Sequence, residues 1–227
     1  KGITLARQSN DEQTLKNIRR DNIKLSTYRN LQVRFNDLEV PVYSELILGL
    51  PGETVESWKR GIDELLTSGL RNQLFIYLCQ ILPNTELDHS DYRKLHGIQS
   101  KRTKLTEIHG AIREEGWVDE FEDIVIATAS MPHEEWREMV KFSWATMFLH
   151  SMKAGFFVLG WLWDRFKISP SEFISFVQPN LSELFGWDGL FDKMLDGEGR
   201  VAILPAYGGI YWDVEEAVLL RASEDWI

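Results

Sequence analysis

Apolar and polar residues repeat with the periods of strands and helices over residues 1–87. Residues 3–8 have the composition of a strand, and residues 9–12 have the spacing of a capping box at the start of a helix. Residues 27–38 place apolar side chains at helical spacing and predict a second helix. The almost uninterrupted apolar run over residues 40–50 is typical of a strand buried on both faces, as in parallel sheets.

Turn and cap residues separate this strand from the next helix. Pro51 and Gly52 turn the chain, Thr54 is a capping residue for the helix that follows, and Gly69 is a residue type that ends helices. Residues 74–78 predict a further strand. The order strand, helix, strand, helix, strand indicates a parallel α/β structure, either a barrel or an open sheet, with its chemistry at the carboxyl ends of the strands.

The pattern changes near residue 88, and the sequence beyond it is mostly helical. It predicts a short strand over residues 124–129, one long helix over 133–166, an aromatic-rich loop around 185–187, and helices near 171–176 and 214–222. We therefore expect two domains, residues 1–87 and residues 88–227, the second of them mostly α-helical.

The longest apolar stretch, residues 142–163, is long enough to be weighed as a membrane span. His150 and Lys153 lie near its middle, and a central lysine costs about 2.5 to 3.5 kcal/mol on insertion. We expect a buried core helix instead, covered by the loop near Trp187 and by the last helix. No membrane partner is predicted.

Charge balance and cysteine count exclude several classes of partner. A formal net charge of −10 over 227 residues argues against nucleic acid, which binds clustered Lys and Arg. The single cysteine, Cys79, allows no intrachain disulfide and no site built from several thiolates, which fits a cytoplasmic protein. The five histidines lack metal-site spacing, so no metal ligand is predicted. The start at Lys1, with neither Met nor a signal peptide, predicts a piece of a longer protein.

Glu45 is the residue that the pattern singles out, because a carboxylate within an apolar strand must be paired or hydrogen-bonded. Strand alternation places Tyr43, Glu45 and Ile47 on one face of the strand. From the residues alone, Glu45 is either half of an ion pair with a neighbouring Arg or Lys, or part of a site for a ribose hydroxyl and an aromatic base. Gln8 alternates onto a face with Ala6 and is likewise either an ordinary buried amide or a ligand-binding group.

Two strings of residues carry a resemblance to a known family. Gln8-Ser9 followed by Leu15, Ile18 and Arg20, and then residues 45–54 (ELILGLPGET), resemble the second half of a radical S-adenosylmethionine (SAM) barrel. Residues 77–86 (YLCQILPNTE) resemble the branch of that family that carries an N-terminal cobalamin (B12)-binding domain. The resemblance implies a partial, half TIM-type β/α barrel over residues 1–87, followed by the mostly α-helical domain.

The resemblance also implies roles for single residues. Gln8 and Arg20 would contact the methionine part of SAM. Glu45 would bind its ribose, and Ile47 would pack against its adenine. The residues whose backbone would meet the adenine edge are Tyr77, Leu78 and Cys79. No catalytic residue is implied, because in this family the cofactors perform the chemistry.

The chain departs from the family where the iron–sulfur cluster is bound. The family needs three closely spaced cysteines on one loop for its [4Fe-4S] cluster, and this sequence has Cys79 alone. The cofactors implied are SAM, the [4Fe-4S] cluster with its ligands outside this chain, and, in the B12-binding branch, cobalamin. The partners implied are a small-molecule substrate and the missing N-terminal half of the same protein.

Three functions stay open at this point. The first is part of a radical SAM enzyme that cleaves SAM at the cluster to modify an organic substrate, with or without cobalamin as methyl carrier, and that is inactive as this chain alone. The second is a non-catalytic nucleotide-binding or assembly module. The third is an unrelated α/β enzyme with Glu45 as acid or base, which requires a second titratable group nearby. An open sheet with residues 3–8 at its edge favours the first function over the second.

Overall fold

Strands and helices alternate in the first part of the computed structural model, which describes residues 2–104, 107, 108, 111, 112, 116, 118 and 120–185. The elements up to residue 88 are β1 (Ile3–Gln8), α1 (Glu12–Asn17), α2 (Leu25–Asp37), β2 (Val42–Leu48), α3 (Val55–Leu66), β3 (Leu74–Leu78), β4 (Gln80–Ile81) and the 3₁₀ turn η1 (Glu86–Asp88). Each predicted strand and helix of this part is present, and the last predicted strand has the bounds of β3. The chain therefore has the predicted α/β character.

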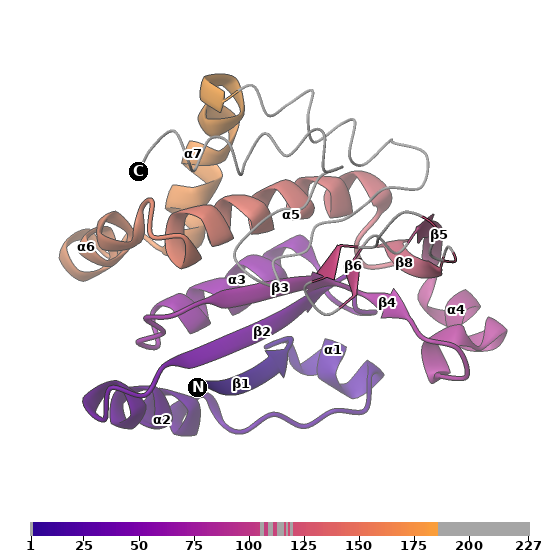
Figure 1. The fold of residues 1–227 in the computed structure, drawn as a ribbon, viewed down its shortest axis with the longest axis horizontal. Helices are drawn as coiled ribbons and strands as arrows, with labels where there is room; N and C mark the ends of the chain where they lie inside the picture. Colours follow the sequence, from indigo (N-terminus) through magenta and orange to yellow (C-terminus); the bar gives the residue numbers. More distant parts are fainter. Residues whose placement is uncertain are drawn as a thin grey trace.

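The first three strands form one parallel sheet in the order β1-β2-β3. Side chains of β2 alternate strictly between buried and partly exposed, as a strand with one covered face requires. The covered face packs against α2 and α3 through Tyr28, Leu46, Trp58, Ile62 and Ile76. Figure 1 shows α5 on the same side of the sheet as α3, and α5 also contacts β2 directly.

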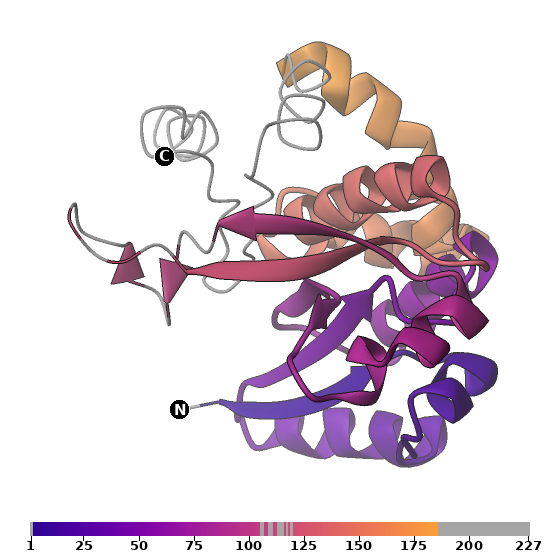
Figure 2. The same cartoon turned by 90° about the vertical axis from the view of Figure 1, so that its right-hand side faces the viewer.

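A second, antiparallel sheet has the order β4-β8-β5, with β5 spanning Gln99–Lys104 and β8 spanning Phe121–Ala127. Figure 2 shows its two long strands side by side. The other elements of this region are α4 (Ser90–His96) and the two-residue strands β6 (Glu107–Ile108) and β7 (Ala111–Ile112). The sequence predicted one short strand at 124–129 and missed β5, because its residues are nearly all polar and show no apolar alternation.

The predicted single helix over 133–166 is wrong, because three segments occupy this stretch. They are α5 (His133–Thr146), the π-helical segment η2 (Met147–Ser151) and α6 (Phe156–Phe166). The break is fixed by the side chain of Ser151, which accepts a hydrogen bond from the Leu74 N–H at 3.0 Å and donates to the Leu74 carbonyl at 3.1 Å. Lys153 then adopts a left-handed backbone (φ 71°), which turns the chain into α6.

Burial of the apolar stretch also differs from the expectation of a core helix. Most of α5 and η2 is buried, but in α6 Phe157 is 83% exposed and Trp161 is 58% exposed. The predicted cover, the loop near Trp187 and the last helix, lies outside the described residues. Among the residues that the structure describes, no helix combines the length and the apolar character that a membrane span needs.

The helices after β8 share one hydrophobic core with the parallel sheet. Trp58 of α3 donates its indole N–H to the hydroxyl of Ser143 in α5 at 3.1 Å, and both side chains are buried. Asp63 of α3 accepts two hydrogen bonds of 2.6 Å from Ser171, which holds the start of α7 (Pro170–Phe185) against α3. The predicted division into residues 1–87 and 88–227 stays a prediction, with this core extending across it.

The Trp58–Ser143 hydrogen bond predicts a measurable contribution to stability. Ser143→Ala leaves the buried indole N–H without an acceptor, so the free energy of unfolding is expected to fall by about 1 to 3 kcal/mol. Urea unfolding followed by tryptophan fluorescence measures this difference. Ser26→Ala is the matched control, since Ser26 lies exposed in α2 and its loss is expected to change stability by less than about 0.5 kcal/mol. Equal effects of the two variants would contradict the role of this bond.

Candidate functional site

Glu45 lies in the middle of β2, on the face of the parallel sheet opposite to the one that α2 and α3 cover. Its partners in the sheet register are Ala6 of β1 and Phe75 of β3. Tyr43 and Phe75 approach with ring centroids 5.9 Å apart, and Ile47 pairs with Tyr77 one step further along the strands. The alternation predicted from sequence is therefore observed, and it sets one carboxylate among aromatic and apolar side chains.

Burial and one nearby cation set the charge state of Glu45. Partial burial raises the pKa of the Glu45 carboxyl, and the positive charge of Arg20 opposes that rise. No described cation lies within ion-pair distance of Glu45, so the ion pair that the residues alone left open is not formed in the described part of the chain. Arg20 is the charged group that acts on it, and the described residues supply no second carboxylate to form an acid–base pair.

Gln8 and Arg20 both lie at the carboxyl end of β1. The pairing of β1 with β2 shifts between Ala6 and Gln8, and Gln8 has a left-handed backbone (φ 57°). This bulge interrupts the simple alternation that put Gln8 on one face with Ala6. The amide oxygen of Gln8 is buried and has no hydrogen-bond partner among the described residues. Arg20 is exposed and its guanidinium reaches the Ala6 carbonyl at 3.5 Å.

Cys79 joins the two sheets through its backbone. Its N–H donates to the Leu48 carbonyl at 2.8 Å, and its carbonyl accepts from the Val125 N–H at 2.8 Å. The N–H is thus used within the protein, and the predicted contact of the Tyr77, Leu78 and Cys79 backbone with an adenine edge stays a prediction. Burial raises the pKa of the Cys79 thiol to about 12, so the thiol is neutral at physiological pH.

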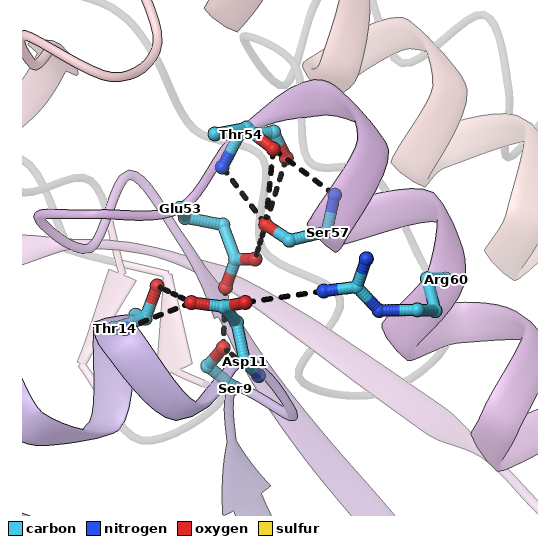
Figure 3. Close-up of polar contacts among 7 residues, drawn as sticks. All are labelled: Ser9, Asp11, Thr14, Glu53, Thr54, Ser57 and Arg60. Carbon is cyan, nitrogen blue, oxygen red and sulfur yellow. Dashed lines mark hydrogen bonds and ion pairs between the residues drawn. The ribbon is translucent and has the colours of Figure 1, made fainter.

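A buried carboxyl group that the sequence analysis assigned no role, Glu53, organises the neighbouring loops. Glu53 is 1% exposed and accepts hydrogen bonds from the hydroxyls of Ser9 and Ser57. Figure 3 shows these groups converging from the end of β1, the loop after β2 and the first turn of α3. Thr54 caps α3 in a reciprocal capping box with Ser57, as the sequence predicted for Thr54.

The cap of α1 differs from the prediction because Ser9 is engaged with Glu53. Asp11 caps α1, accepting from the Thr14 N–H at 2.9 Å, whereas the capping-box spacing had pointed to Ser9. Ser9 instead accepts from the Asp11 N–H at 3.0 Å. Asp11 also forms an ion pair with Arg60 of α3 at 3.1 Å. The signal that sequence reasoning passed over was Glu53 itself, an acid directly after an apolar strand and its turn.

Gly52 allows the loop after β2 to approach α1 closely. It has a left-handed backbone (φ 100°), and a Cβ atom there would lie 2.5 Å from the Asn17 amide nitrogen. Asn17 donates to the Pro51 carbonyl at 2.9 Å, and the Gly52 N–H donates to the Ser130 hydroxyl at 3.0 Å. The turn is therefore held by groups from two other segments.

The buried Glu53 predicts a specific dependence of stability on pH. Burial raises the pKa of Glu53 above its ordinary value of 4.5, the Ser57 and Ser9 hydrogen bonds opposing the rise, so the folded state holds this proton more tightly than the unfolded state. Its contribution to stability is therefore full below pH 4.5 and is lost as the pH rises through the raised pKa. In Glu53→Gln this loss should be absent.

Urea unfolding of the wild type and of Glu53→Gln across pH 4.5 to 8 tests this expectation. The stability difference between the two proteins should shift in favour of the variant with rising pH. A difference that is constant with pH would show that Glu53 titrates at its ordinary pKa.

Comparison with known proteins finds two relatives that each match about two thirds of this chain. The chain is 37% identical over 151 residues to the cobalamin-dependent radical SAM methyltransferase TokK of Streptomyces tokunonensis. This match covers 66% of the chain and 22% of that protein. The chain is 35% identical over 153 residues to 2-(S-pantetheinyl)-carbapenam-3-carboxylate methyltransferase of Streptantibioticus cattleyicolor, again covering 66% of this chain and 22% of the relative.

These matches test the resemblance to radical SAM enzymes that the sequence motifs indicated. No protein-family model matches the chain. The chain spans about a fifth of the length of the relatives it matches, 22% in each case, so the whole activity of those proteins is not carried over by the match. The resemblance itself is confirmed, and this chain is a homologue of cobalamin-dependent radical SAM methyltransferases over 66% of its length.

Proposed function

We propose that this chain is part of a radical SAM enzyme that transfers a methyl group to a small organic molecule, with cobalamin as methyl carrier. The homology to methyltransferases carries this proposal. We propose further that β1, β2 and β3 form half of a TIM-type barrel, completed by another part of the same protein. The open parallel sheet supports this, because within the described residues β1 and β3 are each paired on one edge alone.

The side chains around Glu45 and at the carboxyl end of β1 have hydrogen-bonding groups and apolar surface that match the parts of SAM. The Glu45 carboxylate is an acceptor for ribose hydroxyls, and Ile47 beside Tyr77 offers an apolar surface to a purine. The unpartnered amide oxygen of Gln8 is an acceptor for the ammonium group of a bound methionine moiety. Arg20, exposed at the same end of β1, is a donor for its carboxylate.

The iron–sulfur cluster does not fit the residues of this chain. A [4Fe-4S] cluster of this family needs three thiolates, whereas the sequence has one cysteine, and burial keeps that thiol neutral. No group of three or more metal-ligating side chains is found in the described residues. We assign the cluster and cobalamin to other parts of the enzyme; together with SAM they supply the radical and methyl-transfer chemistry.

The chain's own contribution, in this proposal, is to bind and orient SAM. Gln8 accepts a hydrogen bond from the methionine end of the molecule and Glu45 accepts from its ribose, and two such contacts fix the position of SAM on the sheet. The aromatic row of Tyr43, Phe75 and Tyr77 limits the water that reaches this face. Positioning of this kind acts on the reaction without any side chain of the chain forming a bond to the substrate.

Removal of the Glu45 carboxylate is expected to weaken SAM binding. In the intact enzyme Glu45→Ala should cost about 1 to 3 kcal/mol of binding free energy, since a charged hydrogen-bond partner is lost. Isothermal titration calorimetry with SAM measures the change. Glu56→Ala, an exposed carboxylate of α3, should leave the SAM affinity unchanged. Wild-type affinity in Glu45→Ala would remove Glu45 from the site.

Reconstitution with iron tests the assignment of the cluster to another part of the protein. The 227-residue chain, treated anaerobically with iron and sulfide, is expected to hold no stoichiometric [4Fe-4S] cluster, because it offers one buried thiol. A full-length protein comparable in length to the relatives should hold a cluster and cleave SAM reductively. Iron analysis and the visible absorbance of the cluster report the outcome. Four irons per molecule in the chain alone would contradict the proposal.

A further inference from the structure

A cavity of about 520 Å³ lies between α6 and the segment that joins α3 to β3. Its walls are mostly apolar and aromatic, and include Leu70, Phe156, Leu159, Trp161 and Trp163. A cavity of this size falls within the usual range for small-molecule sites, about 300 to 1,000 Å³. Trp161 is 58% exposed, so the aromatic lining extends to the surface.

His150 is a buried residue in the wall of this cavity. Its imidazole lines the cavity, is 3% exposed, and is carried by the π-helical segment η2. The Nε2 atom lies 3.0 Å from the Leu70 carbonyl oxygen, which has only lone pairs to offer, so Nε2 carries the proton and donates. Nδ1 is therefore an acceptor in the neutral ring.

This acceptor is unused in the described protein. Nδ1 of His150 is buried and has no hydrogen-bond partner among the described residues. Buried polar atoms are normally satisfied, and each exception calls for an explanation. Burial lowers the pKa of His150 to about 4, the Leu70 bond opposing that shift, so the ring is neutral at physiological pH and Nδ1 keeps its lone pair. A ligand that fits must bring a donor.

The rest of the lining agrees with a ligand that is aromatic and donates a hydrogen bond. Asp164 offers a second acceptor, and Arg71 is the cation of the lining. The Phe156 ring lies 5.3 Å from the imidazole between centroids, and Nδ1 is covered, so a ligand reaches this atom only if a neighbouring side chain such as Phe156 moves aside. Phe157 packs edge-on against Phe156 and is 83% exposed, and the Lys153 ammonium lies 4.0 Å from the centre of the Phe156 ring.

The cavity is separate from the face proposed for SAM. Leu70 and Arg71 precede β3, and Ser151, next to His150, bonds to Leu74 at the amino end of that strand. Glu45 instead lies on the sheet face opposite to α2 and α3, and Gln8 lies at the carboxyl end of β1. Occupation of the cavity thus does not depend on SAM.

We propose that the cavity between α6 and the α3–β3 segment binds a neutral, indole-sized aromatic molecule whose ring N–H or hydroxyl donates to Nδ1 of His150. The aromatic walls supply stacking and apolar burial, and the single buried acceptor selects for a donor in the ring plane. The site is independent of the proposed methyl transfer.

Two probe molecules of nearly equal shape test this proposal on the 227-residue chain. Indole has a ring N–H, and benzofuran has an oxygen in its place that can only accept. Ligand-observed NMR titration should show binding of indole about three- to tenfold tighter than binding of benzofuran, the effect of one hydrogen bond. His150→Phe keeps a ring and should abolish that preference.

Surface variants keep the test decisive if His150→Phe does not fold. Trp161→Ala removes a partly exposed wall and should weaken both probes, whereas Phe176→Ala, 73% exposed and outside the lining, should weaken neither. Tighter indole binding that Trp161→Ala weakens supports the site. Three outcomes would overturn the proposal: equal affinity for indole and benzofuran, no binding of either probe at the highest soluble concentration, or binding that Trp161→Ala does not weaken.

Discussion

The hydrogen bonds to the buried carboxyl of Glu53 hold together the edge of the molecule at which the parallel strands end. Ser9 reaches it from the end of β1 and Ser57 from the first turn of α3, while Glu53 itself follows the turn after β2. A buried carboxyl group without hydrogen-bond partners destabilises the folded state by several kcal/mol. Separation of these segments would remove the partners of Glu53 and is therefore unfavourable. The position of Gln8, next to Ser9, and with it part of the proposed SAM surface, depends on this connection between the loop after β1 and the β2–α3 segment.

Much of the parallel sheet could be predicted from the sequence because local signals and burial agree there. The apolar run of β2, the Thr54 cap and the short strand β3 are each specified by their own residues, so periodicity sufficed. Prediction from local periodicity was wrong or incomplete where contacts between distant segments determine the secondary structure. Strand β5 is polar and exists through its pairing with β8, and the break after α5 is set by Ser151 bonding to Leu74 across the core.

The candidate site shows the same division between what is local and what is not. The face of Glu45 followed from alternation, but the left-handed bulge at Gln8 did not, since no Gly or Asn marks that position. The role of Glu53 was missed because its partners are far apart in the sequence and both are ordinary serines. The predicted contacts with SAM stay predictions that binding experiments decide; they involve Gln8, Arg20, Glu45, Ile47, Tyr77, Leu78 and Cys79.

Cys79 is the residue at which the chain changes from one sheet to the other. Strand β3 ends one residue before it, β4 begins one residue after it, and its two backbone hydrogen bonds run to Leu48 and Val125. Because neither sheet can part from the other without breaking those bonds, we expect amide hydrogens on both sides of the junction to exchange with solvent through a common opening. The antiparallel sheet β4-β8-β5 and the carboxyl ends of the parallel strands would then open as one unit, and a ligand that orders the strand ends would also slow local unfolding of the antiparallel sheet.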